Sequence, residues 1–139
     1  MSTRSTIRFM KENEDPVATV YKHYDGGIGG FGYELAKWLS GMTLINGMMT
    51  DDHYGEKYAN GVGCLAAKFI KKFKKETGDI YLCAPDPDYK EDYNYKVIVE
   101  PYGLEKSAND CVTIEVDCFG TPIFKGSPKE LMEFEESYD

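Results

Sequence analysis

The stretch YKHYDGGIGGFGYELAKWL, residues 21–39, decides the fold because three kinds of local structure meet in it. Alternating polar and apolar residues from Val17 to Asp25 predict a half-buried strand. The glycine run from Gly26 to Gly32 predicts a loop, because so much glycine raises the entropic cost of any regular element. Apolar side chains at helical spacing then predict a helix from about Phe31 to Ser40 that Gly41 ends. A strand therefore leaves a sheet through a glycine loop and enters a helix.

The rest of the chain shows the same two periodicities. Upstream, Ser5 to Met10 alternates and is joined to the strand above by the charged turn Lys11 to Pro16, so the two strands predict a hairpin. The predicted order is β-β-α-α-β-β-β-β-α, which indicates an α+β single domain over residues 1–139, with a mostly antiparallel sheet of five or six strands and two or three helices on one face. The downstream elements are a helix at Gly61 to Thr77, strands at Ile80 to Ala84, Tyr95 to Val99, Cys111 to Phe119 and Thr121 to Phe124, and a helix that begins at Ser127 and buries Leu131, Phe134 and Tyr138.

The composition indicates an acidic globular protein. The chain has 139 residues, and 24 acidic residues against 16 Lys and Arg give a formal net charge of -8. This charge excludes non-specific attraction to nucleic acid or to an anionic membrane. The polar start, together with the lack of an apolar run near about 18 residues, predicts a cytoplasmic protein. The four cysteines have no C-x-x-C spacing and are expected to be reduced thiols.

The glycine run is also a candidate binding site. Gly27, Gly29 and Gly32 satisfy the pattern G-x-G-x-x-G, and a glycine loop that opens a helix presents backbone N–H groups to an anion such as a phosphate. A dinucleotide site of the Rossmann type is disfavoured, because that fingerprint requires a parallel βαβ unit and the strand here is a hairpin arm. The alternative is that the run only lets the chain leave the sheet edge. The predicted ligand-binding set is Arg4, Arg8, Lys22, Tyr24, Asp25, Gly26, Gly27, Gly29, Gly30, Phe31 and Gly32.

A second candidate is a metal site formed around the two histidines. His23 and Asp25 share one face of a strand, and Asp52 precedes His53 in the irregular stretch from Gly47 to Gly61. Imidazoles and carboxylates together can hold a transition metal and activate a water. The spacing matches no strict site, so solvated turn chemistry is the favoured interpretation and no cofactor is expected.

Charge is distributed unevenly along the chain. Five lysines place +5 on the outer side of the second helix, which leaves -13 elsewhere; they predict a solvated helix face, or else a rim for an anion or for the acidic face of a second copy. Residues 85–139 hold 14 acids and 5 lysines among several tyrosines. This acidic segment keeps the protein soluble, or it imitates the phosphates of nucleic acid and occupies a basic groove on a partner. The lysines are Lys68, Lys71, Lys72, Lys74 and Lys75, and the first acids of the second segment are Asp86, Asp88, Glu91 and Asp92.

Several segments resemble a family of small uncharacterised proteins of tailed bacteriophages and prophages. The similar segments are STRST at 2–6, YKHYDG at 21–26, GFGYELAKWL at 30–39, NGVGCLAA at 60–67 and FKGSPKEL at 124–131. Gly27 departs from the family pattern, because many relatives carry an aromatic residue there. The family offers no activity that transfers residue by residue. The resemblance implies a context instead, since small phage accessory proteins often disarm host immunity by sequestering a nucleotide signal or by binding a defence protein.

Three functional hypotheses follow. The leading one is a homo-oligomeric phage accessory protein in the host cell cytoplasm that counters antiviral defence by non-enzymatic binding, with an anionic nucleotide held at the glycine loop. The alternative is an acidic mimic of nucleic acid that binds a host defence protein directly. The second alternative is a metal-dependent hydrolase that uses His23, Asp25, Asp52 and His53. Neither a membrane nor non-specific nucleic acid is expected as a partner.

Overall fold

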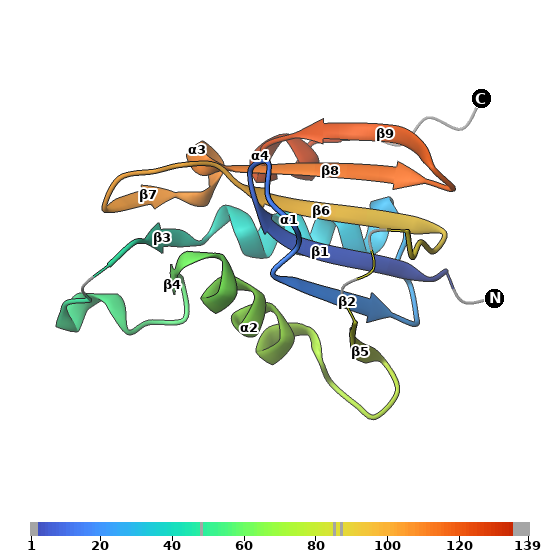
Figure 1. Cartoon of the computed structure of the whole chain (residues 1–139), viewed down its shortest axis with the longest axis horizontal. Helices are drawn as coiled ribbons and strands as arrows, with labels where there is room; N and C mark the ends of the chain where they lie inside the picture. Colours follow the sequence, from blue (N-terminus) through green and yellow to red (C-terminus); the bar gives the residue numbers. More distant parts are fainter. Residues whose placement is uncertain (1–2, 48, 85, 87, 135–139) are drawn as a thin grey trace.

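A six-stranded sheet forms the centre of the fold (Figure 1). The computed structural model describes residues 3–47, 49–84, 86 and 88–134. The strands run in the order β5-β2-β1-β6-β8-β9, and each neighbouring pair is antiparallel except β1 with β6. Their bounds are β1 Ser5–Lys11, β2 Ala18–Lys22, β5 Ile80–Cys83, β6 Tyr93–Val99, β8 Val112–Cys118 and β9 Thr121–Gly126.

A smaller sheet of three short strands lies at one end of the molecule, on the left in Figure 1. Its strands are β3 (Thr43–Ile45), β4 (Tyr58–Asn60) and β7 (Glu105–Ser107), in the order β4-β3-β7. A short 3-10 helix, η2 (Asp51–His53), interrupts the connection from β3 to β4. Because β4 runs directly into α2 (Gly61–Phe73), this small sheet fixes where that helix begins.

The alternation of the strands gives the central sheet two different faces. The register places Ile7 opposite Val20 and Tyr95, and all three side chains are fully buried. One residue along β1, Arg8 stands opposite Lys96. Successive side chains of a strand point to opposite faces, so Ile7 and its neighbours form an apolar face, which we call the helix face. Arg8 and Lys96 belong to the other, polar face, which we call the open face.

Helices cover the helix face. In Figure 1, α1 (Tyr33–Ser40) and α4 (Pro128–Met132) lie behind the strands and pack on each other, and α2 packs on β1. The ring of Phe69 in α2 is central to this layer, with its centroid 5.3 Å from that of Phe9 and 6.1 Å from that of Phe31. Burial of one large aromatic side chain contributes about 1.5–3 kcal/mol, so this cluster fixes α2 and the glycine run against the same sheet.

The predicted α+β class with a mostly antiparallel sheet is confirmed, whereas several predicted boundaries are wrong. The glycine run is not entirely a loop, because Ile28–Gly32 forms a π-helical turn, η1, that continues into α1. The second helix ends at Phe73 rather than at Thr77, because Lys74 has an extended backbone. The last two lysines of the predicted basic face therefore lie beyond α2.

Short elements are the ones that the sequence did not predict. They are β3, β4, β7 and the four-residue helix α3 (Ala108–Cys111), which takes the start of the predicted strand at Cys111. The C-terminal helix α4 begins at its capping serine and buries Leu131, as expected. It ends at Met132, so the predicted stripe is too long: Phe134 follows the helix and is half-buried, and Tyr138 lies outside the described residues. None of the helices in the described ranges combines the length and the apolar character that a membrane crossing needs.

Candidate functional site

Much of the predicted glycine site is committed to the fold. The N–H of Gly26 donates to the carbonyl of Thr3 at 2.8 Å. The N–H groups of Gly30 and Gly32 both donate to the carbonyl of Gly27 at 3.2 Å, inside the π-helical turn. These three N–H groups therefore point into the chain and not toward a ligand.

Packing against β1 explains why residue 26 is glycine. A Cβ atom at Gly26 would lie 2.5 Å from Oγ and 2.6 Å from Cβ of Ser5, well inside normal van der Waals separation. The hydroxyl of Tyr95 also donates to the carbonyl of Gly26 at 2.7 Å. At Gly29 and Gly30, by contrast, an added Cβ would meet nothing within 4 Å. The glycine run is thus a close crossing over β1 followed by a helical turn in which Gly29 and Gly30 are exposed.

The predicted cationic side chains of this site lie on different faces of the sheet. The ammonium of Lys22 is 5.3 Å from the centroid of the buried Phe31 ring, on the helix face, and burial lowers the pKa of Lys22. Arg8 projects from the open face, because it alternates with Ile7 along β1. The structure brings Lys22 and Phe31 together and places Arg8 elsewhere, which corrects the predicted site.

The other predicted side chains of the glycine site lie at the surface. Arg4 is exposed, and its backbone N–H donates to the Asp92 carboxylate at 3.3 Å. Tyr24 packs edge-on against the ring of His23, with the centroids 4.5 Å apart. Asp25 is exposed and has a left-handed backbone with φ of 53°. These contacts order the approach to the glycine run without directing the side chains toward one point.

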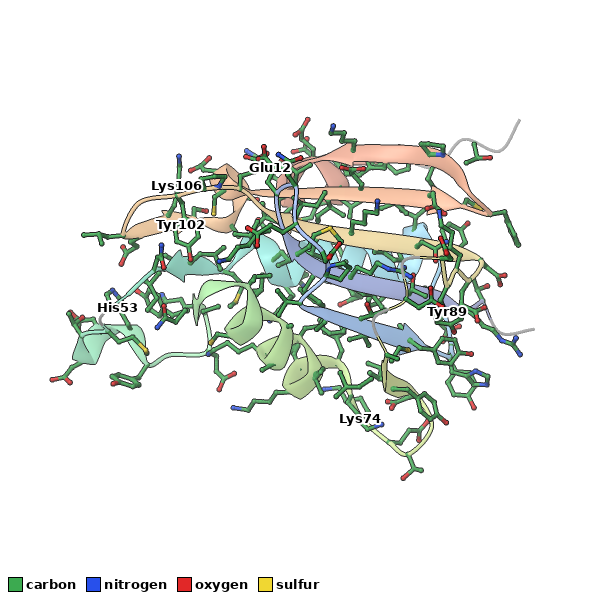
Figure 2. All side chains as sticks on the ribbon, viewed as in Figure 1. Glu12, His53, Lys74, Tyr89, Tyr102 and Lys106 are labelled. Carbon is green, nitrogen blue, oxygen red and sulfur yellow. The ribbon has the colours of Figure 1, made fainter. Side chains whose placement is uncertain are left out.

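The two histidines of the predicted metal site lie apart. His23 follows β2, and its Nδ1 is 2.6 Å from the hydroxyl of Tyr21. His53 lies at the opposite end of the molecule, where its Nε2 is 2.8 Å from Oε1 of Glu105 (Figure 2). Among the described residues, no group of three or more His, Cys, Asp or Glu side chains is arranged to hold a metal ion. The structure therefore does not assemble His23, Asp25, Asp52 and His53 into one centre.

Three of the lysines in and after α2 contact neighbouring segments. Lys71 forms an exposed ion pair with Glu56 at 2.8 Å. Lys74, labelled in Figure 2, lies 3.0 Å from the carboxylate of Asp79. Lys68 donates to a carbonyl of the loop before β4 at 3.0 Å. These contacts attach loops to the helix and engage three of the five lysines of the predicted basic rim.

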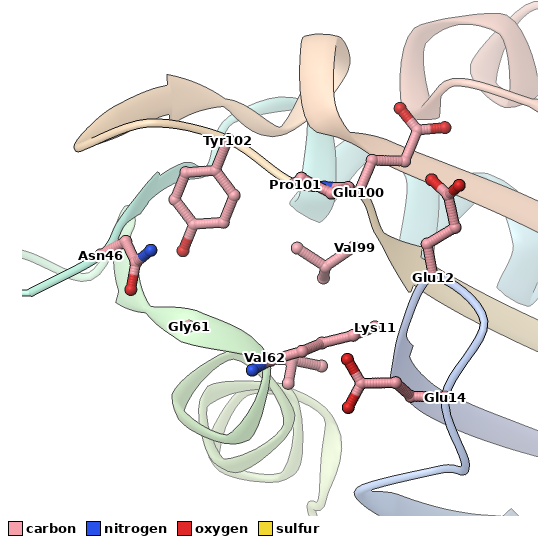
Figure 3. Close-up of a pocket in the computed structure, with 10 residues that line it drawn as sticks. All are labelled: Lys11, Glu12, Glu14, Asn46, Gly61, Val62, Val99, Glu100, Pro101 and Tyr102. Carbon is pink, nitrogen blue, oxygen red and sulfur yellow. The ribbon is translucent and has the colours of Figure 1, made fainter.

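A cavity of about 320 Å³ lies between the β1–β2 turn, the end of β6 and the first turn of α2 (Figure 3). Its lining includes the buried, apolar side chains of Val62 and Val99, and the ring of Tyr102 stands at one side. We call this cavity the first hollow. Its charged lining residues are Lys11, Glu12, Glu14 and Glu100.

Hydrogen bonds fix the groups around the first hollow. The N–H of Glu12 donates to the last carbonyl of β6 at 3.0 Å, which ties the β1–β2 turn to that strand. The hydroxyl of Thr113 donates to Oε1 of Glu100 at 2.8 Å. The hydroxyl of Tyr102 donates to the carbonyl of Ile45 at 2.8 Å, and burial raises its pKa. The hollow is therefore formed before any partner arrives.

A second hollow of about 300 Å³ adjoins the first and shares Glu12 and Glu100 with it. It adds Glu115 of β8 and Lys125 of β9. In the part of the chain that the structure describes, none of the carboxylates or lysines that line the two hollows belongs to an ion pair. The carboxylates that line the two hollows are thus available to a cationic ligand. We call the combined lining of the two hollows the acidic surface; its carboxylates are those of Glu12, Glu14, Glu100 and Glu115.

The sequence predicts only a turn at residues 11–16 and assigns it no function. The available signal is its composition, because three of its six residues are acidic. The decisive feature is the parallel pairing of β1 with β6, which places Lys11 opposite Val99 and so brings Glu100 beside the turn. No local pattern predicts a pairing across about ninety residues, so the acidic surface appears only in the structure.

Comparisons with protein-family models, with curated proteins and with solved structures find no match for this chain. The functional argument therefore starts from the acidic surface. Carboxylates attract ammonium and guanidinium groups, while apolar walls and a tyrosine ring accept the aliphatic stems and planar heads of lysine and arginine. This arrangement can bind basic side chains of a partner.

Proposed function

We propose that the chain is a non-enzymatic binding protein that captures a basic protein partner on its acidic surface. The observation that carries the proposal is the pair of adjoining hollows, which share Glu12 and Glu100 and are lined by four carboxylates against two lysines, none of them in an ion pair among the described residues. Unpaired carboxylates around apolar walls favour a partner that supplies both the charge and an aliphatic stem.

The size of the hollows favours single side chains over a whole small molecule. Cavities of about 300–1,000 Å³ hold typical small ligands, and each hollow lies at the lower end of that range. Two neighbouring hollows suit two basic side chains of one partner. In the phage context that the resemblance implies, this partner is a basic nucleic-acid-binding protein of host defence, and the acidic surface stands in for the nucleic acid.

Nucleotide capture at the glycine loop is the less favoured function. The N–H groups of Gly26, Gly30 and Gly32 are engaged by backbone carbonyls, and Arg8 lies on the other face of the sheet. We retain non-enzymatic binding from the leading hypothesis and assign it to the acidic surface instead of the glycine loop. The homo-oligomer remains a prediction.

Binding of a fluorescein-labelled nonaarginine peptide, followed by fluorescence anisotropy, tests the proposal. The decisive variant is Glu12→Gln/Glu100→Gln, which keeps the shape of both hollows and removes the two shared charges. The matched control is Glu34→Gln/Glu133→Gln, which makes the same charge change at exposed residues that line neither hollow. Each exposed pair contributes up to about 1 kcal/mol, so the double variant should bind about tenfold more weakly than the control.

Salt dependence gives a second readout. Binding should weaken between about 50 and about 200 mM salt, because the Debye length shortens over that range. The proposal fails if the wild-type chain does not bind the peptide, or if the variant and its control bind it equally. Double-stranded DNA must also release the basic partner from this chain, since the DNA and the acidic surface would compete for the same basic groove on the partner.

A further inference from the structure

Arg8 is a buried cation that forms no ion pair within the described residues. Its residue is 4% exposed although it lies on the open face. The guanidinium donates from Nη1 to Oγ1 of Thr6 at 2.8 Å and from Nη2 to the carbonyl oxygens of Asp86, at 3.0 Å, and Tyr89. All of these acceptors are neutral, and no carboxylate among the described residues forms an ion pair with Arg8. A buried charge without an opposite charge is costly.

Arg8 is one of the residues that line a cavity of about 180 Å³ on the open face. Lys90 and Lys96 line the same cavity, together with the carboxylates of Glu14 and Asp117. Lys96 is exposed and forms no ion pair in the described part of the chain, and Lys90 reaches Asp117 only at 3.9 Å. This cavity therefore carries three cations against two carboxylates in a chain whose net charge is -8.

The lining of this cavity is held in place by buried hydrogen bonds. The hydroxyl of Thr6 donates to Oδ1 of Asn94 at 2.7 Å, and Nδ2 of Asn94 donates to Oδ1 of Asp117 at 2.8 Å. The Asp117 carboxylate also accepts the N–H of Gly120 at 3.2 Å. These hydrogen bonds fix the position of the Asp117 carboxylate, which forms an ion pair with Lys90 and, among the described residues, none with Arg8. Both Thr6 and Asn94 are almost fully buried, so the site is rigid.

We propose that this cavity binds a phosphate group, and this proposal does not rest on the one made for the acidic surface. A phosphate supplies negative charge beside Arg8, Lys90 and Lys96 and accepts charge-assisted hydrogen bonds from such cations. The volume of about 180 Å³ accepts a phosphate with some water, at about 30 Å³ for each water molecule. It is smaller than the roughly 300 Å³ at which pockets begin to enclose a whole small ligand. A nucleotide would therefore insert only its terminal phosphate.

Isothermal titration with inorganic phosphate and, in a second arm, with adenosine monophosphate tests the site at low ionic strength. The principal variant is Lys96→Gln, because Lys96 is exposed and forms no ion pair in the described residues. Loss of one charge-assisted contact should weaken phosphate binding about tenfold. Lys96→Arg should restore it, and the control Lys106→Gln, at the far end of the molecule in Figure 2, should leave it unchanged.

The two arms separate the sources of the phosphate. Tighter binding of the nucleotide identifies a terminal phosphate as the ligand, and equal binding identifies free phosphate; both support the site. The absence of saturable heat with either ligand up to about 10 mM overturns the proposal, as does equal binding by Lys96→Gln and Lys106→Gln. Neither overturning result affects capture of the arginine peptide, so this site and the acidic surface stand or fall separately.

Discussion

Alanine at residue 26 should destabilise the fold strongly, whereas alanine at residue 30 should stabilise it. The new Cβ of Gly26→Ala would lie 2.5 Å from Oγ of Ser5, 2.6 Å from its Cβ and 3.1 Å from the carbonyl of Thr3. Overpacking of this kind costs about 1–3 kcal/mol, because backbone or side chain must move. Gly30→Ala meets no atom within 4 Å and lies in a helical turn, so it should add about 0.5–1 kcal/mol of stability.

Urea denaturation measures both changes. With an m-value of about 2 kcal/mol/M, the midpoint should fall by about 0.5–1.5 M for Gly26→Ala and rise by about 0.25–0.5 M for Gly30→Ala. A double variant provides the internal check. Ser5→Gly removes both atoms of the clash, and the buried Oγ that it deletes has no hydrogen-bond partner. Ser5→Gly/Gly26→Ala should therefore recover part of the loss, with a coupling free energy of about 1 kcal/mol or more.

Two results would refute this reasoning. Equal midpoints for Gly26→Ala and Gly30→Ala would mean that the close approach to Ser5 has no energetic consequence. A double variant whose loss is the sum of the two single losses would mean that Ser5 is not the atom group in conflict. In either case the glycine run would need another explanation, and binding through its backbone would regain support.

Two further perturbations follow from the titratable groups. Burial by itself raises the pKa of Asp79, but the N–H groups of Lys75, Glu76 and Ile80 and the Lys74 ammonium lower it well below its usual range. A folded-state pKa below the unfolded pKa of about 3.9 stabilises the fold at higher pH, and this stabilisation is lost as the pH falls below that value. Asp79→Asn should thus lower the melting temperature at pH 7 and lower it progressively less below pH 4. An equal loss at pH 7 and below pH 4 would contradict the assignment. Burial raises the pKa of Cys111 to about 11, so about one thiol in a thousand is ionised at pH 8. Mass spectrometry after iodoacetamide treatment of the folded chain should therefore find Cys111 unmodified. Rapid labelling of Cys111 would refute its burial.

The long elements of this fold could be predicted because their periodicity is local. The alternation of Ile7 and Phe9 with polar residues already assigns Arg8 to the opposite face, and the structure agrees. The strands of the small sheet are three residues long, too short for a period to show. They exist because β3 pairs with chain segments on both sides, and that pairing is a tertiary effect.

The candidate site was harder to predict than the fold, for a physical reason. The glycine motif has the residue types of a phosphate loop, but sequence alone does not say where its N–H groups point, and the structure uses those of Gly30 and Gly32 inside a π-helical turn. The burial of Arg8 depends on the loop that supplies the carbonyl oxygens of Asp86 and Tyr89, far along the chain. The residue types therefore indicated phosphate chemistry, whereas the directions of the N–H and guanidinium donors depend on tertiary contacts that the local sequence does not reveal.

The position of Glu14 links the two proposed sites. Its residue lines both the first hollow and the cavity of Arg8, so its carboxylate attracts a basic side chain on one side and opposes a phosphate on the other. A partner cation that neutralises Glu14 would remove this repulsion and strengthen phosphate binding, and by linkage a bound phosphate would strengthen capture of that cation. The surface therefore suits a partner that brings a basic side chain and a phosphate together, as a nucleotide-bound or nucleic-acid-bound basic protein does. The net charge of -8 is a sum over the whole chain, so it does not distinguish the acidic surface from the neighbouring cavity of Arg8.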